Sequence, residues 1–114
     1  MDEMAVYQVV VSDKARDMLF THASFLAQVS VKAGDALFDE FEKIVSSLEA
    51  MPERCALYFN PYIQPGKYRR IALGKYLLVL FQIIGNKVHI ELVIDARAEN
   101  KNLSDTMDSI NADN

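Results

Sequence analysis

The sequence predicts a small α+β domain in which two helices pack on one face of a largely antiparallel sheet. Three observations predict it: a β-branched run near the start, two consecutive amphipathic helical patterns, and three strand-like segments joined by tight turns. The chain has 114 residues, 51% hydrophobic and 25% charged, which is typical of one globular domain. The predicted order is therefore β-α-α-β-β-β.

The first half supplies one strand and both helices. The run "AVYQVVVS", residues 5–12, is rich in β-branched side chains and is expected to be a strand. Ser12 is a favourable N-cap for a first helix, and Ser30 for a second. The second helix carries one apolar stripe with members three or four residues apart: Leu37, Phe41, Ile44, Leu48 and Met51. Pro52 ends this helix, whereas the break between the helices is left open within "FLAQVSVKAGD".

The second half begins with the irregular segment "ERCALYFNPYIQPG" and continues as three strands. Strands are expected at residues 67–73, 76–84 and 87–95, with glycine-containing turns between them. The middle one is apolar on both parities, as in a central strand covered on both faces. The last one alternates, so four residues are expected to face the core: Val88, Ile90, Leu92 and Ile94. Their neighbours are expected to face away: His89, Glu91, Val93 and Asp95.

The stretch "KYRRIALGKY" sets two arginines side by side in a strand. Because side chains alternate, Arg69 should lie on the helix side, with its guanidinium group extending past the helix ends, and Arg70 on the opposite side. The face away from the helices is then expected to gather Tyr68, Arg70, His89 and Arg97, with Glu91 and Asp95 among them.

Charge is distributed unevenly along the chain. The net charge is −4, yet no Asp or Glu occurs between Arg54 and Ile90, a stretch that holds six lysines and arginines. Arginine binds phosphate or carboxylate with two parallel hydrogen bonds. We therefore predict a partner- or anion-binding surface made of five cations and a tyrosine: Arg54, Lys67, Arg69, Arg70, Tyr76 and Arg97. An ion pair of Arg70 with Glu91 or Asp95 is the alternative, and it stays open here.

Other chemistry has little support in the sequence. His22 and His89 lack neighbours at metal-ligand spacing, so no metal site and no cofactor are predicted. Cys55 is the only cysteine, which excludes an intramolecular disulfide and fits a reducing compartment. No segment resembles a signal peptide or the ~20 apolar residues of a membrane span, so a cytoplasmic protein with no membrane partner is expected.

The segment "YRRIALGKYLLVLFQIIGNKVHIELVIDARAEN" resembles the closing strands of the RelE/ParE superfamily of bacterial type II toxins, including those of the plasmid stabilisation type. The residues that carry the resemblance are Tyr68, Arg69, Arg70, Gly74, Tyr76, Leu77, Asp95 and Arg97. The order of elements fits over about residues 5–103. The resemblance implies a RelE/ParE-like fold and a cognate antitoxin that wraps around the toxin and blocks its working surface.

The superfamily divides in activity. RelE-like members cleave messenger RNA in the ribosome, whereas ParE-like members poison DNA gyrase. Leu77 stands where RelE-like enzymes often have arginine, and Asn100 where they have a tyrosine, so the resemblance favours a ParE-like toxin that inhibits its target by binding.

Two alternatives stay open. One is an endoribonuclease in which Arg69, Arg70 and Arg97 stabilise phosphorane charge. Its groups for proton transfer would come from Tyr68, Tyr76 or His89. The other is a non-toxic interaction domain with the same fold, and homodimer formation is also left open. The toxin domain is placed at residues 1–103 and an acidic, flexible tail at residues 104–114. Four acids, Glu99, Asp105, Asp108 and Asp113, motivate the hypothesis that the tail folds back over the basic strands.

Overall fold

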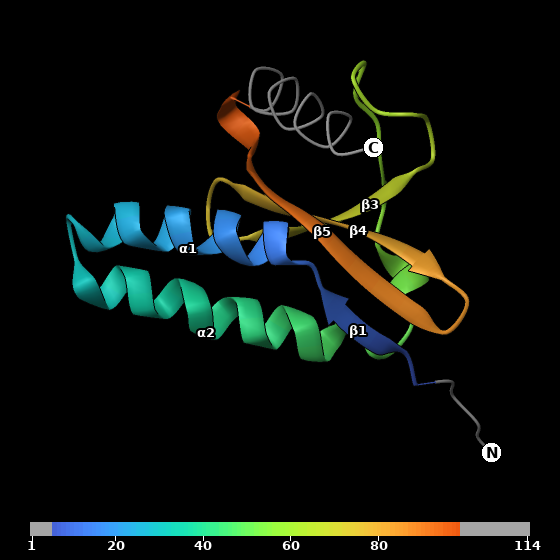
Figure 1. The fold of residues 1–114 in the computed structure, drawn as a ribbon, viewed down its shortest axis with the longest axis horizontal. Helices are drawn as coiled ribbons and strands as arrows, with labels where there is room; N and C mark the ends of the chain where they lie inside the picture. The colour runs from blue at the N-terminus through green and yellow to red at the C-terminus, as the bar shows by residue number, and fades with distance from the viewer. Residues whose placement is uncertain (1–5, 99–114) are drawn as a thin grey trace.

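The computed structural model describes residues 6–98 and consists of a five-stranded mixed sheet with a helical hairpin on one face (Figure 1). The elements are β1 (Gln8–Val11), α1 (Asp13–Ala27), α2 (Val31–Ser47), the 3-10 turn η1 (Pro52–Arg54), β2 (Leu57–Tyr58), β3 (Tyr68–Leu73), β4 (Leu77–Ile84), β5 (Lys87–Asp95) and η2 (Ala96–Ala98). The strand order is β1-β5-β4-β3-β2, with β1 parallel to β5 and every other pair antiparallel. The predicted class and order are confirmed, and β2 is an additional short strand. The predicted tail, residues 104–114, lies outside the described residues.

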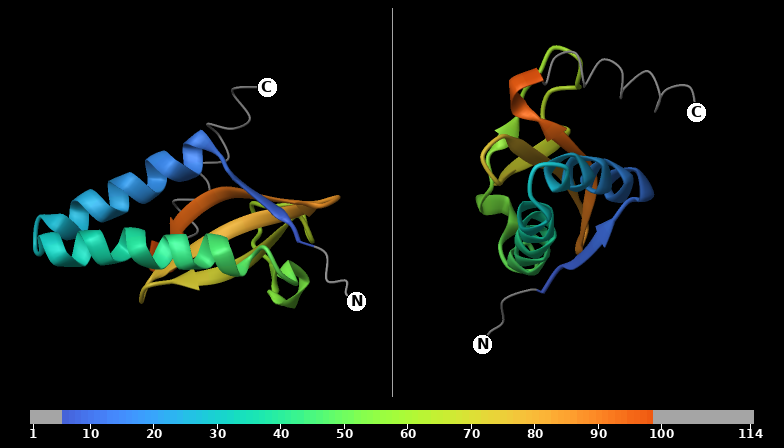
Figure 2. Two further views of the ribbon diagram at one scale, coloured as in Figure 1. Left: turned by 90° about the horizontal axis from the view of Figure 1, so that it is seen from below. Right: turned by 90° about the vertical axis from the view of Figure 1, so that its left-hand side faces the viewer.

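Both predicted helix caps are present. The Ser12 hydroxyl accepts a hydrogen bond from the Ala15 amide at 3.0 Å, and the Ser30 hydroxyl accepts one from Ala33 at 3.2 Å. Each bond satisfies an amide that has no partner within its helix. The break that the sequence left open falls at residues 28–30, between α1 and α2. The helical hairpin extends past the end of the sheet at this turn (Figure 2).

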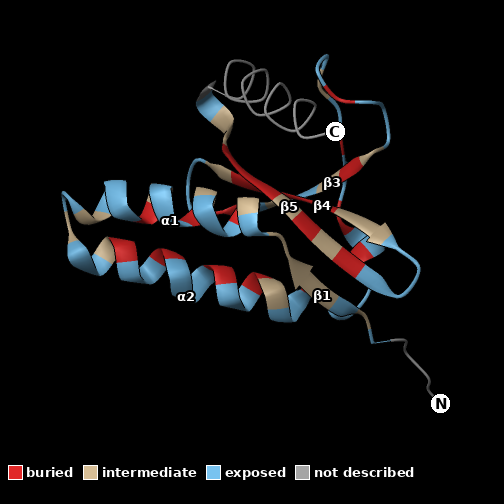
Figure 3. Ribbon diagram, in the orientation of Figure 1, coloured by how far each residue is buried: buried red, intermediate tan, exposed pale blue. Residues whose placement is uncertain are grey.

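One core lies between the hairpin and the sheet. Four members of the predicted stripe, Leu37, Phe41, Ile44 and Leu48, pack with residues of α1 on the side chains that three strands direct toward the helices. The prediction that Met51 belongs to the stripe is wrong, because it lies beyond the end of α2 and is 60% exposed. Figure 3 marks buried positions on both helices and along β5. The strand members of this core are Leu73, Val79, Phe81, Val88, Ile90 and Val93. We call the side of the sheet that carries them the helix face. Burial of this apolar stripe supplies the main driving force for docking the hairpin.

A β-bulge in β5 changes which side chains face the helices. Ile90 lies opposite Phe81 and Leu92 lies opposite Leu80, so Glu91 is an extra residue without a partner in β4. The alternation therefore resumes one residue out of step. The prediction that Leu92 and Ile94 face the helices while Val93 and Asp95 face away is wrong, because the sequence pattern does not reveal the inserted residue.

The other side of the sheet carries a second apolar cluster. Its members are Tyr58, Ile63, Tyr68, Leu78, Leu80, Leu92 and Ile94. We call this side the distal face, and it also carries Arg70, Gln82, His89 and Glu91. The doubly apolar pattern of residues 76–84 is explained, since β4 contributes buried side chains to both clusters.

Candidate functional site

A buried tyrosine and a carboxylate form the centre of the distal face. The Tyr68 hydroxyl donates to Oε1 of Glu91 at 2.9 Å, and the Gln82 amide donates to Oε2 at 2.5 Å. The phenol is 1% exposed. Burial, together with the negative charge and hydrogen bond of Glu91, raises the pKa of Tyr68 well above its ordinary value. Tyr68 is therefore a neutral hydrogen-bond donor at physiological pH.

Two cations and a histidine border this centre. The Lys67 ammonium lies 5.3 Å from the centroid of the Tyr68 ring, within the range of a cation–π contact. His89 is half-buried and lies opposite Gln82. Arg70 is exposed and lies opposite Leu80. Within residues 6–98, no side chain forms a hydrogen bond or ion pair with its guanidinium group, and both carboxylates considered for it bind other groups.

Arg69 lies on the helix face, as the alternation predicted, opposite Phe81 in β4. Its Nη1 donates to the carbonyl oxygen of Cys55 at 2.7 Å and to that of Glu53 at 3.1 Å. These bonds tie the segment before β2 to β3 and satisfy two carbonyl groups. Arg69 is therefore separated from Arg70 by the sheet and has a structural role.

Arg54 acts at the end of α2. Its Nη1 lies within hydrogen-bond distance of the carbonyl oxygens of Ser47, Ala50 and Met51, at 3.3, 2.9 and 3.1 Å. Its Nη2 donates to the Ser47 hydroxyl at 3.1 Å. A cation is favourable there because the last carbonyls of a helix lack intrahelical partners and carry partial negative charge. Sequence reasoning missed this role, although a basic residue just past a helix end is its usual signal.

Arg97 is held by Asp95. Its Nη2 lies 2.8 Å from Oδ2, its Nε lies 3.1 Å from Oδ1, and its backbone amide donates to Oδ1 at 2.8 Å. The guanidinium carbon also lies 3.9 Å from the centroid of the Tyr76 ring. The hydrogen bond from Arg97 lowers the pKa of Asp95. The bulge places this pair on the helix side, so the predicted grouping of Arg97 with Arg70 is wrong.

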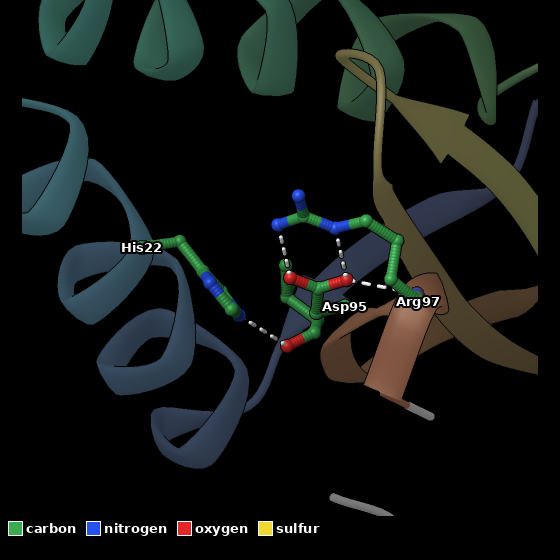
Figure 4. A network of polar contacts seen from close by, with 4 residues as sticks. His22, Asp95 and Arg97 are labelled. Carbon is green, nitrogen blue, oxygen red and sulfur yellow. Dashed lines mark hydrogen bonds and ion pairs between the residues drawn. The ribbon is translucent and has the colours of Figure 1, made fainter. Parts of the chain in front are cut away.

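A groove of about 570 Å³ lies where this ion pair meets the hairpin. His22 of α1 lies close to Asp95, and its Nε2 donates to the carbonyl oxygen of Val93 at 3.2 Å (Figure 4). The walls of the groove are largely apolar, and Phe25 is 68% exposed beside it. The site thus combines an apolar wall with a polar end made by His22, Asp95 and Arg97.

Metal binding has no support in the described part of the chain, where no three His, Cys, Asp or Glu side chains come together. The Cys55 thiol is buried, and burial raises its pKa, which disfavours the reactive thiolate. Within residues 6–98, no helix has the length and apolar composition needed to cross a membrane.

This architecture, a helical hairpin on an antiparallel meander with a parallel edge strand, is that of the RelE/ParE class of small toxins. The sequence matches the family model described as "ParE toxin of type II toxin-antitoxin system, parDE" over residues 9–100. The chain therefore belongs to the ParE toxin family of type II toxin-antitoxin systems, as the resemblance in the closing strands predicted.

Among solved structures, the chain is similar to one described as "Chromosomal ParDE TA system from P. aeruginosa". The TM-score is 0.63 and the identity 15%, and the match covers 80% of this chain and 97% of that chain. At this identity the similarity establishes a shared fold. None of the curated proteins compared with the chain matches it.

Proposed function

We propose that this ParE-family toxin inhibits DNA gyrase by binding to it, with Arg70 as the central contact of the distal face. The observation that carries the proposal is the different state of the four predicted arginines. Arg54 and Arg69 bind carbonyl oxygens of the chain itself, and Arg97 binds Asp95. Arg70 is exposed and keeps its bidentate hydrogen-bonding capacity for a partner.

The chemistry of the distal face favours binding over RNA cleavage. Attack by a 2′-hydroxyl needs a group that accepts a proton and cations close to the phosphate. Tyr68 stays protonated and already donates to Glu91, while Arg69 and Arg97 lie on the helix side. One exposed guanidinium and the nearby Lys67 suit recognition of a carboxylate or phosphate on a macromolecular surface.

We further propose that the toxin acts in the cytoplasm and is neutralised by a cognate antitoxin that enters the groove beside Arg97. Phe25 and Tyr76 are 68% and 48% exposed at this groove, and exposed apolar side chains of this kind are typical of protein interfaces. A partner segment with an apolar face and one carboxylate would contact both the wall and the polar end made by His22 and Arg97.

Three measurements test the proposal. Induction of the chain alone in bacteria should stop growth, and co-expression of the adjacent reading frame should restore it. The purified toxin should inhibit supercoiling by gyrase, and Arg70→Glu should weaken this inhibition. Mapping of messenger ends after induction should yield no codon-positioned cuts. Such cuts would instead identify an endoribonuclease, and normal growth with abundant folded protein would identify a non-toxic interaction domain.

A further inference from the structure

We propose that two copies of the chain pair through the outer edges of their β1 strands, so that the two sheets become one continuous sheet. In this dimer the two β1 strands run antiparallel about a twofold axis at Val10. Val9 of each copy exchanges backbone hydrogen bonds with Val11 of the other copy. The inference concerns self-association and does not depend on what the toxin inhibits.

The first argument is the direction of the backbone groups of β1, which lies at one border of the sheet (Figure 1). The Gln8 amide donates to the carbonyl oxygen of Asn86, at the start of the parallel pairing with β5, at 3.0 Å. Alternate residues of a strand direct their amide and carbonyl groups to opposite sides, so those of Val9 and Val11 point away from β5. Within residues 6–98, no hydrogen bond reaches these groups. The outer edge of β1 therefore offers two donors and two acceptors to a further strand.

The second argument is that nothing in β1 prevents pairing at its outer edge. Exposed edge strands are usually protected by charged side chains, by proline, by a bulge or by very short length. β1 has the sequence QVVV, with no charge and no proline, and its register with β5 is regular. The opposite border of the sheet is different, because β2 has only two residues and Pro61 follows it closely. The contrast indicates that β1 is the edge at which another strand is added.

The third argument selects a second copy as the occupant, and it is the charge at the two ends of β1. Near the last residue of β1, Arg16 of α1 is exposed and lines a groove of about 650 Å³ together with Val11. Near the first residue, the Tyr7 amide donates to the carbonyl oxygen of Glu49 at 2.9 Å, and Glu49 is exposed.

A twofold axis makes the paired strands antiparallel and brings each end of β1 beside the opposite end of the other copy. Arg16 of each copy then lies toward Glu49 of the other, so two opposite-charge contacts flank an uncharged centre. The edge is therefore complementary to itself, as an interface between identical surfaces requires.

Amide hydrogen exchange of the full chain, followed by NMR, tests the pairing residue by residue. The exchange of Val9 and Val11 should slow about tenfold when the protein concentration rises about a hundredfold, because the monomer fraction of a predominant dimer falls with the square root of concentration. The Val10 amide points to β5 and should be protected at every concentration. Exchange of Val9 and Val11 that does not change with concentration would overturn the proposal.

A matched pair of variants tests the outer amide. Val9→Pro removes this donor and places the proline ring at the edge, while the hydrogen bonds between β1 and β5 remain. Val9→Ala shortens the same side chain and keeps the amide. Light scattering should give twice the mass of one chain for the original protein and for Val9→Ala, and the mass of one chain for Val9→Pro. A monomeric original protein, or equal masses for the two variants, would contradict edge pairing.

The antiparallel arrangement is tested by reversing charges. Arg16→Glu should weaken the dimer about tenfold, since two exposed ion pairs are lost in each dimer. Adding Glu49→Arg to this variant should restore the affinity, because the two contacts re-form with their charges exchanged. Dissociation constants from analytical ultracentrifugation measure both effects. An unchanged affinity in Arg16→Glu, or no recovery in the double variant, would contradict the antiparallel arrangement.

The product of the adjacent reading frame tests the other occupant of the edge. If the chain alone is monomeric and the Val9 and Val11 amides become protected only when this product is added, the edge binds a strand of the antitoxin and the dimer is wrong. None of these measurements depends on toxicity, so the dimer can fail independently of the proposed function.

Discussion

The two faces of the sheet differ in how they use charged side chains. On the helix face and at its borders, arginines complete the fold: Arg69 binds two carbonyl oxygens and Arg97 binds Asp95 and the Tyr76 ring. On the distal face, Arg70 is exposed while Tyr68, Gln82 and Glu91 satisfy one another. The same strands therefore build two different faces. On the helix face the arginines make their hydrogen bonds within the chain, whereas the distal face keeps the guanidinium group of Arg70 available to a partner.

This difference bears on how an acid-free basic segment is interpreted. Six cations between Arg54 and Ile90 suggest a binding surface. The structure assigns two of its three arginines to backbone carbonyl groups. Guanidinium groups are well suited to this role because they hold several donors in a plane. A count of basic residues thus overstates the charge that a partner can contact.

The comparison is sharpened most directly by deleting Glu91. Leu92 would then follow Ile90 directly, so an uninterrupted alternation would keep Leu92 and Ile94 on the distal face and Val93 and Asp95 toward the helices. Both apolar clusters should survive, and we expect a loss of about 2–4 kcal/mol in the free energy of unfolding, because the Tyr68 hydroxyl and the Gln82 amide lose their acceptor. Chemical denaturation of the purified variant measures this loss.

Glu91→Gln is the matched control, since it keeps the number of residues and removes only the charge. It should cost about 1 kcal/mol through weaker hydrogen bonds to Tyr68 and Gln82. Equal losses for the deletion and the substitution would show that the two donors require the negative charge of Glu91, and not only its hydrogen-bond acceptor.

The polar network of the distal face is tested by Tyr68→Phe. The change removes the donor to Oε1 of Glu91 at a buried position, and we expect a loss of about 1–2 kcal/mol in the free energy of unfolding. Tyr76→Phe is the control, because its exposed hydroxyl has no hydrogen-bond partner among residues 6–98. Tyr76→Phe should leave the free energy of unfolding unchanged. Similar losses for both variants would contradict a stabilising role of the hydrogen bond from Tyr68 to Glu91.

The functional half of the comparison is tested by Arg70→Glu. If Arg70 is the central contact, the variant should bind its target about tenfold to a hundredfold more weakly, since hydrogen bonds to charged groups are worth ~1.5–3 kcal/mol. Inhibition of gyrase supercoiling by the purified toxin measures the change. Lys87→Glu makes the same charge change at the exposed start of β5 and should have little effect. Equal weakening by both variants would indicate general electrostatic attraction.

The smallest effect is expected from acid titration of the ion pair on the helix side. The folded-state pKa of Asp95 is lowered, chiefly by the hydrogen bond from Arg97, so its contribution is present above the unfolded-state pKa and is lost as pH falls through the folded-state value. Asp95→Asn should flatten the decline of the free energy of unfolding below about pH 4. The change should be small because the Arg97 side chain is 61% exposed. An unchanged pH profile would show that the pair does not stabilise the fold.

The fold could be predicted because its signals are local. Ser12 and Ser30 cap the helices, the stripe of the second helix enters the core from Leu37 to Leu48, and two glycine turns separate the last three strands. The bulge could not, because Val88, Ile90, Leu92 and Ile94 fit an uninterrupted alternation as well as the actual one. β2 was missed because two residues within an irregular segment carry no periodicity.

The candidate site was predicted in part. Alternation separated Arg69 from Arg70 correctly, since β3 has no irregularity before its turn. Arg97 was misplaced because its position depends on the bulge upstream. The role of Arg54 depends on η1 returning the chain beneath the end of α2, and that path is a tertiary feature. The binding role of Arg70 itself stays a prediction.

The close approach of the two helices has a mechanical consequence. A Cβ at Gly34 would lie 2.9 Å from the carbonyl oxygen of Ala23 and 3.1 Å from the Ala27 Cβ, so the backbones of α1 and α2 touch near their shared turn. We therefore expect the two helices to move together as one rigid unit. α1 packs on β5, which lies between β1 and β4 in the sheet. A protein that binds the turn between α1 and α2 and displaces the hairpin is therefore expected to displace β5 as well.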